Sequence, residues 1–250
     1  MAGNTSAPGT TVASRVLALL GAFDAEHRSL PLSELARRAG LATPTAHRLA
    51  AELVAAGFLV RAPGGEYVVG RRVWDIGLLA PVQSELRQVA SPFLHDLYGA
   101  TLATVHLAVR DGMRALYVDR LSGSASVPVV SQVGSRLPLH ATGVGKVLLA
   151  HAPRDVQERV LAELTRITPY TVTQPGLVRE QLRRVHRDGF AQTVEEMSLG
   201  ACSVAVPVST RAGVVVAALG IVVPRIGRDR PRLLSALQVA ARGIGRSVDP

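Results

Sequence analysis

Apolar positions between Leu32 and Leu59 follow the spacing of two short helices separated by a glycine. They recur every three or four residues, so they share one face of each helix. They are Leu32, Leu35, Ala36 and Ala39, followed by Ala46, Leu49, Ala50 and Leu53. Gly40 is expected to end the first helix, since glycine adopts the left-handed conformation without strain. Thr43 is expected to cap the second helix, with Pro44 at its first helical position and Gly57 after its end.

Two short helices around a tight turn are typical of a helix-turn-helix, whose second helix enters the DNA major groove. The polar face of the predicted second helix is short and partly basic, and it carries Thr43, Thr45, His47 and Arg48. Threonine hydroxyls can contact bases or phosphates, and an arginine can pair with guanine or grip a phosphate. The alternative is a helical hairpin that only packs within a larger domain.

The next stretch, Leu59–Gly70, predicts a β-hairpin, because two β-rich runs flank the turn sequence Ala62-Pro63-Gly64-Gly65. A hairpin directly after a recognition helix is the wing of a winged helix-turn-helix, and Arg61 on it can reach a phosphate or the minor groove. An amphipathic helix over Ser14–Phe23, which Ser14 can cap, completes a three-helix unit. The wing therefore favours DNA binding over a purely structural hairpin.

Two further helices are predicted before the pattern changes. Arg71–Ala80 is too apolar for a free linker, so it either packs on the winged unit or pairs with its copy in a dimer. Pro81 interrupts it, and a second amphipathic helix runs from about Ser84 to Tyr98. We therefore place the domain boundary near Pro81, with the helices on either side acting as the connection.

From Thr101 onward the pattern is that of strands, later interspersed with helices. The turn signal at Asp111-Gly112 predicts a hairpin over Leu102–Leu121. Further strands are predicted at Ser126–Val133, Phe190–Val194, Ala201–Val208 and Val214–Val223, and helices at Gly143–Ala150, Arg154–Leu164, Leu177–Asp188 and Pro231–Val248. This order predicts a mixed α+β domain with a largely antiparallel sheet, of the size of a small-molecule sensor.

Charge and composition change this picture only in part. The 250-residue chain carries a net charge of +9, which suggests a polyanionic partner, but residues 1–72 hold only eight arginines against five acidic residues. The single Cys202 excludes an intrachain disulfide and fits a reducing cytoplasm. No secretory signal and no apolar stretch long enough to span a bilayer is visible, so we expect no membrane partner.

Several apparent chemical motifs fail on spacing. Gly143–Lys146 lacks the preceding glycine and following hydroxyl of a phosphate-binding P-loop. No group of His, Cys and Asp has metal-ligand spacing, so neither a metal nor another cofactor is expected. His106 lies within a strand pattern and is interpreted as a core or interface histidine rather than a ligand contact. Glu195 and Glu196 are adjacent, so in a strand they face opposite sides and cannot form an acid/base pair; a loop would relax that limit.

Three stretches, in this order, resemble the IclR family of bacterial transcriptional regulators. The first is the winged unit with its Thr-Ala-His-Arg-Leu helix. The second is Leu137–Ala150, which is similar to the family's LPxHxTxxGKxLLA segment. The third is Gly189–Val208, which is similar to its GYaxdxEExxxGxxcvAxPv segment. Each motif alone is moderately specific, whereas their order over about residues 12–248 is strongly specific.

The resemblance implies a winged helix-turn-helix joined by a helical linker to a GAF-like effector-binding domain, with dimers or tetramers on operator DNA. We divide the chain accordingly into a disordered tail (1–11), the winged domain (12–72), a linker and dimerisation region (73–98) and the effector domain (99–250). The implied effector is small, often an organic or aromatic acid. Its pocket carries over onto Leu137, Gly143, Val144, Thr193, Ala201, Ser203, Gly220 and Val222.

This chain departs from the family pattern within that pocket. Ser203 stands where some members have a cysteine, and Gly220 and Val222 stand where some have serines. Losing hydroxyl donors predicts a roomier, more apolar pocket, which favours a larger or aromatic ligand over small keto acids. The helix starting near Gly143 still offers free N–H groups to an anion. Lys146 is either an additional cation there or only a surface or packing residue.

We therefore expect a cytoplasmic regulator without enzymatic activity, in which a metabolite bound in the second domain changes the affinity of the winged domain for its operator. One alternative is an enzyme of GAF-like fold that acts on a small acid through Ser203, with the helices as a dimerisation unit. Another is a scaffold whose winged domain binds protein.

Overall fold

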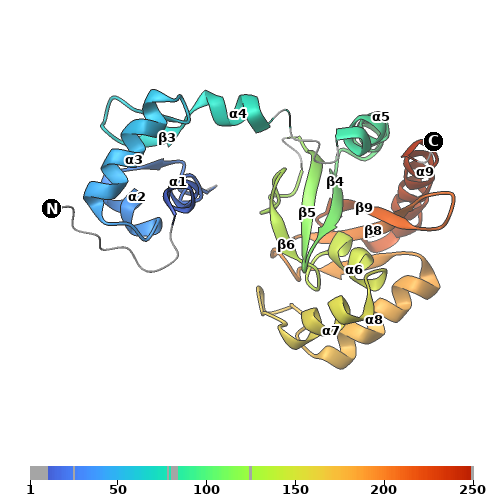
Figure 1. Cartoon of the computed structure of the whole chain (residues 1–250). Helices are drawn as coiled ribbons and strands as arrows, with labels where there is room; N and C mark the ends of the chain where they lie inside the picture. Colours follow the sequence, from blue (N-terminus) through green and yellow to red (C-terminus); the bar gives the residue numbers. More distant parts are fainter. Residues whose placement is uncertain (1–10, 25, 78, 80–83, 124–125, 249–250) are drawn as a thin grey trace. The chain divides into compact units, whose positions relative to one another are not determined.

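The computed structural model describes residues 11–24, 26–77, 79, 84–123 and 126–248 (Figure 1). The chain divides into two compact units, Met1–Val82 and Gln83–Pro250, and each has its own hydrophobic core. Residues 1–10 of the expected disordered tail and the expected break at Pro81 lie outside the described residues.

Three helices and a small sheet form the first unit, as expected for a winged helix-turn-helix. Leu19, Leu35 and Leu49 pack at the centre of its core, one from each helix. The helices are α1 (Val12–Leu20), α2 (Leu32–Arg38) and α3 (Thr43–Ala55), and the sheet has the order β1 (Ser29–Leu30), β3 (Tyr67–Val69), β2 (Leu59–Arg61). The turn between α2 and α3 contains Gly40 at a φ of +66°, in the predicted left-handed conformation.

Two of the predicted helix caps are wrong by a few residues. Thr11, not Ser14, caps α1, because its hydroxyl accepts the Ser14 N–H at 3.1 Å. At α3 the carbonyl of Ala42 already accepts the Ala46 N–H at 3.0 Å, so Ala42 is the residue that precedes the helix. Thr43 is therefore within the first turn, and its hydroxyl is not used as a cap.

Helix α4 (Arg71–Gly77) follows the wing and leaves its apolar side chains at the surface. Trp74 is 61% exposed and Ile76 is 47% exposed, and Leu79 just beyond the helix is 82% exposed. The interpretation that this helix packs on the winged unit is therefore wrong for these side chains.

The second unit is built on a sheet with the strand order β6-β5-β4-β9-β8-β7, in which each described pair is antiparallel. The strands are β4 (Thr104–Asp111), β5 (Arg114–Leu121), β6 (Arg136–Pro138), β7 (Ala191–Val194), β8 (Cys202–Ser209) and β9 (Val215–Val223). The predicted strand at Ser126–Val133 is absent. Pro128 lacks an N–H for a ladder, and the short strand β6 pairs with β5 instead.

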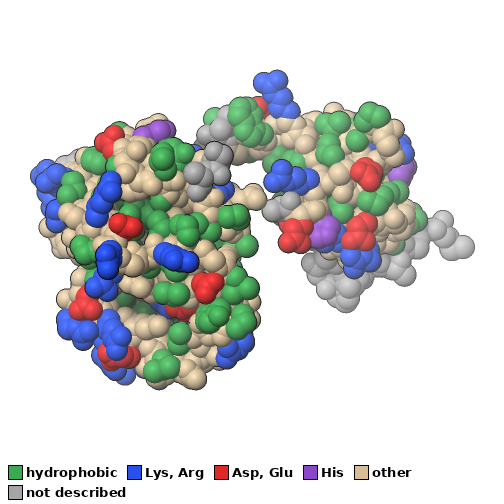
Figure 2. Space-filling model, turned by 180° about the vertical axis from the view of Figure 1, so that it is seen from behind, with side chains coloured by type: hydrophobic (Ala, Val, Ile, Leu, Met, Phe, Trp, Pro, Cys, Tyr) green, Lys and Arg blue, Asp and Glu red, His purple; other side chains and the backbone are tan. Residues whose placement is uncertain are grey.

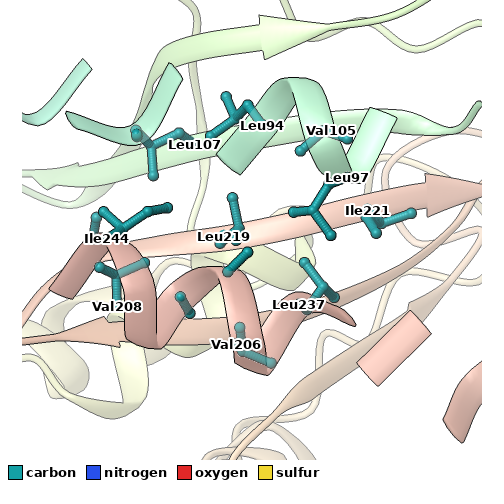
Figure 3. Close-up of a cluster of buried hydrophobic side chains, with 14 of the residues drawn as sticks. Leu94, Leu97, Val105, Leu107, Val206, Val208, Leu219, Ile221, Leu237 and Ile244 are labelled. Carbon is teal, nitrogen blue, oxygen red and sulfur yellow. The ribbon is translucent and has the colours of Figure 1, made fainter. Parts of the chain in front are cut away.

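Helices cover both faces of this sheet (Figure 1). One face packs on α5 (Ser84–Thr101) and α9 (Arg230–Val248) through large aliphatic side chains such as Leu94, Leu219 and Ile244 (Figure 3). The opposite face carries small residues, Ala108, Ala205 and Ala218, and packs on α6 (Gly143–Ala150). Helices α7 (Arg154–Ala162) and α8 (Pro175–Asp188) lie with α6, and a 3₁₀ turn at Gly227–Asp229 precedes α9.

Helix α9 approaches the end of β8 so closely that only glycine fits at the contact. A Cβ atom on Gly245 would lie 2.0 Å from the carbonyl oxygen of Ser209. We predict that Gly245→Ala lowers the free energy of unfolding by about 1–3 kcal/mol, because the helix must shift away from the backbone it contacts. Urea unfolding followed by circular dichroism measures this loss.

The matched control is Gly99→Ala, at an exposed helical position in α5 with nothing within 4 Å of the added Cβ. That change should stabilise the protein by up to about 1 kcal/mol through helix propensity. Equal stability of the two variants would contradict the close packing of α9 on β8.

Candidate functional site

The exposed face of α3 carries the residues that were predicted to contact DNA. Thr43, His47 and Arg48 are exposed and Thr45 is half-buried, because the intervening apolar positions face the core. In the described part of the chain the Thr43 hydroxyl has no hydrogen-bond partner. Arg48 donates to Glu52 Oε1 at 2.7 Å, one turn along the helix. This ion pair is exposed, so the guanidinium can exchange its partner for a base or a phosphate at little cost.

The wing contributes the fifth predicted DNA contact. Arg61 is exposed at the end of β2, and its Nε donates to the carbonyl of Gly65 at 3.4 Å across the hairpin turn. Gly65 has a φ of +86°, which this turn requires. The five side chains therefore lie on the two elements, recognition helix and wing, that a winged domain presents to DNA.

The second unit contains a cavity between the small-residue face of the sheet and the start of α6. It encloses about 480 Å³ of space, including its open mouth. All eight residues that were predicted to bind the effector line it: Leu137, Gly143, Val144, Thr193, Ala201, Ser203, Gly220 and Val222. Residues that the sequence did not single out for the pocket complete its wall: His106, Tyr117, Val129, Val130, Ser131, Thr142, Met197, Ser198, Ala205 and Ile221.

Hydrogen-bond donors converge on one side of the cavity, at the N-terminus of α6. Thr142 caps this helix by accepting the Gly145 N–H at 3.1 Å. Among the described hydrogen bonds, none uses the N–H of Gly143 or Val144. A Cβ atom at Gly143 would lie 2.5 Å from Ser203 Oγ, so that hydroxyl sits against the helix terminus. Free N–H groups at a helix N-terminus attract a negatively charged group.

The Ser203 hydroxyl is paired with another hydroxyl. Thr193 Oγ1 and Ser203 Oγ are 2.6 Å apart across β7 and β8. Neither a histidine nor a carboxylate bonds to Ser203 in the described structure, so nothing there would activate it as a nucleophile. The pair instead offers one O–H donor to a bound ligand.

His106 occupies a different part of the wall and is both a packed and a pocket-lining residue. Its Nε2 lies 2.8 Å from Ser131 Oγ, and its ring meets Tyr117 edge-on with centroids 4.9 Å apart. Burial, helped by the charge of Arg120, lowers the pKa of His106 to about 3, so the imidazole is neutral at physiological pH. Burial also raises the pKa of Tyr117 to about 12. The interpretation of His106 as a core histidine away from any ligand is therefore incomplete.

The expectation of extra room at Gly220 is wrong. A Cβ atom there would lie 2.8 Å from Val144 Cγ1, so the first turn of α6 already fills the space. The glycine brings the helix terminus close to the sheet rather than enlarging the cavity. The apolar character of the wall agrees with the expectation, since most of the lining side chains are hydrophobic.

Lys146 is a buried packing residue and not a cation of the pocket. It lies on α6, does not line the cavity, and pairs with Glu196. Burial lowers the pKa of Lys146, while the nearby carboxylate opposes that shift. Glu195 and Glu196 lie in the loop after β7, and the partner of Glu196 is this lysine rather than a second acid.

Metal sites, membrane-spanning helices and basic surface patches were also sought in the described residues. Within those residues, no group of His, Cys, Asp and Glu side chains could hold a metal ion. No helix of the described structure is both long and apolar enough to cross a bilayer. Arginines on the visible face of the second unit are scattered among acidic side chains, so no single basic patch stands out there (Figure 2).

Comparisons with known proteins agree with the two-unit organisation. The protein-family model described as "IclR helix-turn-helix domain" matches residues 12–63. The family model described as "Bacterial transcriptional regulator IclR C-terminal" matches residues 80–246. The glycerol operon regulatory protein of Streptomyces coelicolor is 32% identical over 94% of both chains. The HTH-type transcriptional regulator XynR of Escherichia coli is 30% identical over 83% of both.

A solved structure is similar over nearly the whole chain. The crystal structure of an IclR homolog from Microbacterium hydrocarbonoxydans, complexed with 4-hydroxybenzoate, has a TM-score of 0.89 and 34% identity, and the match covers 95% of this chain and 99% of that one. These relatives are named as regulators, which favours a regulator over the enzyme alternative. Because the matched models cover most of the sequence, the chain belongs to the IclR family of bacterial transcriptional regulators.

Proposed function

We propose that α3 and the wing bind operator DNA and that the cavity beside α6 binds a small aromatic acid as the effector. The observation that carries the second part is that two N–H groups, which have no partner among the described residues, and a hydroxyl pair converge on one side of an apolar cavity. A carboxylate placed there is stabilised by the helix terminus, while the ring contacts apolar wall residues. The bound acid then changes operator affinity by its unequal affinity for the two conformational states of the protein.

For the DNA interface, the support is the exposed polar face of α3 together with Arg61 on the wing. The exposed Arg48 lies in the first half of a helix that a winged domain inserts into the major groove. Because the first unit holds only a modest positive charge, its binding to DNA should depend on pairing two copies at a fixed spacing.

We predict that Arg48→Ala weakens binding to the DNA flanking its own gene by about tenfold or more, the magnitude of a lost bidentate arginine contact. A mobility-shift titration at fixed salt measures this loss. The matched control is Arg159→Ala in the second unit, which removes an equally exposed arginine in the same kind of one-turn ion pair, with Asp155. Equal DNA affinity of both variants and the unchanged protein would contradict the assignment of α3 as the reading helix.

For the effector, the solved relative complexed with 4-hydroxybenzoate suggests the chemical class. In this chain Ser203 and Thr193 supply the hydroxyls, Gly143 and Val144 supply the N–H groups, and the neutral His106 adds a further hydrogen-bonding group on the wall. The carboxylate of an aromatic acid can accept hydrogen bonds from these hydroxyl and N–H groups, and its ring can contact the apolar side chains of the remaining wall. This complementarity supports an aromatic acid.

We predict that 4-hydroxybenzoate raises the melting temperature of the protein, because a ligand selective for the native state stabilises it by mass action. Ser203→Ala should weaken the acid's affinity by about tenfold, since hydrogen bonds to a charged group are among the stronger ones. Ser247→Ala on α9 serves as the control, because within the described structure its hydroxyl bonds to the Gly243 carbonyl alone. A melting shift that is the same for all three proteins would remove Ser203 from the site.

We further propose that α4 pairs with its copy, so that two winged domains are held together. Trp74 and Ile76 expose apolar surface there, and several large apolar side chains exposed together in one short stretch favour an interface. A dimer of winged domains matches a palindromic operator.

Trp74 is the only tryptophan of the chain, so its fluorescence reports directly on this contact. We predict a blue-shifted emission at high protein concentration that shifts to the red on dilution, and a red-shifted emission at all concentrations in Ile76→Ser. Light scattering on the same samples gives the mass and separates a dimer from a tetramer. Red-shifted emission of the unchanged protein at every concentration would exclude α4 from the interface.

A further inference from the structure

A buried ion pair between Lys146 and Glu196 does not line the candidate pocket, and its two residues line a separate hollow instead. The side chains of Lys146 and Glu196 are only 1% and 6% exposed, and Nζ of the lysine donates directly to Oε1 of the glutamate. Lys146 is one turn beyond the N-terminal residues of α6, and Glu196 belongs to the loop 195–201 between β7 and β8. The pair therefore joins the helix that supplies the free N–H groups to a loop far away in the sequence.

This loop forms part of the pocket wall. Met197, Ser198 and Ala201 line the cavity from it. The loop has a constrained backbone, since Glu195 has a φ of +53°, an unusual value for a residue other than glycine. Glu195 closes the loop on itself, because its N–H donates to the Ala201 carbonyl at 2.9 Å and its Oε1 accepts the Gly200 N–H at 2.5 Å.

Two buried threonines, Thr168 and Thr171, hold the same loop through its backbone. Thr168 donates to the carbonyl of Glu195 and Thr171 donates to the carbonyl of Glu196, each at 2.7 Å. The second carboxylate oxygen of Glu196 accepts the Val172 N–H at 3.4 Å. Glu196 is thus the point where the loop, helix α6 and the segment between α7 and α8 meet.

A buried ion pair is weak evidence for a stabilising role. Two charges lose their hydration on burial, and replacing a buried ion pair by apolar side chains of similar volume is often neutral or stabilising. What an apolar contact does not provide is a fixed direction, whereas the lysine and the carboxylate specify one geometry. The pair is therefore suited to setting the position of the loop.

We propose that Lys146 and Glu196 are positioning residues for effector binding. They fix the loop 195–201 against α6, so that Met197 and Ser198 hold their place in the wall while α6 presents its N–H groups to the acid. This inference rests on the proposed effector function. Neither residue touches the ligand; both act through the loop and the helix.

The test separates positioning from stability. In the double variant Lys146→Met/Glu196→Met, apolar side chains of similar length replace both charges, and we expect a melting temperature close to that of the unchanged protein. We expect the affinity for 4-hydroxybenzoate, measured by isothermal titration well below that temperature, to fall at least about tenfold. The matched control replaces the exposed Arg179–Glu158 ion pair in the same way, and its affinity should change by less than about twofold.

A second measurement, on a single variant, tests the inference in case the double variant does not fold. In Glu196→Gln, amide hydrogen exchange within the loop 195–201 should be faster than in the unchanged protein, while exchange in β8 stays the same. A folded double variant that binds the acid normally, or a loop whose exchange is unchanged in Glu196→Gln, would overturn the inference. If the unchanged protein itself does not bind the acid, the proposed function fails, and the exchange experiment still decides whether the pair positions the loop.

Discussion

The close approach of α6 to the small-residue face of the sheet is the constraint on which the rest of the second unit depends. One row across three strands consists of Ala205, Gly220 and His106, and a Cβ at the central glycine would collide with Val144 on the helix. Because Ala205 and Gly220 in this row carry little or no side chain, the N-terminus of α6 lies directly against β8 and β9. Its unpartnered N–H groups and the hydroxyls of β7 and β8 are thereby placed in one cavity.

One face of the sheet contributes mainly to stability, and the other forms the candidate binding pocket. Large aliphatic side chains pack against α5 and α9 and form a continuous core (Figure 3). The opposite face carries small side chains where α6 packs closely against it. It also carries buried polar groups such as His106 and Thr193. Buried polar groups stabilise little unless they are paired. His106 is hydrogen-bonded to the Ser131 hydroxyl and Thr193 to the Ser203 hydroxyl.

Elements that depend on local periodicity or a local motif could be predicted from the sequence. Parts of the site that depend on pairing between distant segments could not. The helices, the wing hairpin and the strands β4, β5, β7, β8 and β9 follow from apolar spacing and turn residues. The eight predicted pocket residues line one cavity. They were predicted from the resemblance to the IclR family, because apolar spacing and turn residues do not indicate which side chains line a pocket. His106 was missed because its place in the wall depends on the register of β4 with β9, and Ser131 because an irregular segment reads like a strand.

In the proposed complex, the carboxylate of an aromatic acid binds at the N-terminus of α6. The most direct test is the amide ¹H–¹⁵N spectrum of the protein during titration with 4-hydroxybenzoate. We expect saturable downfield shifts of the Gly143 and Val144 amide protons, because each would donate to the bound carboxylate. Binding of the acid with both of these resonances unmoved would contradict it.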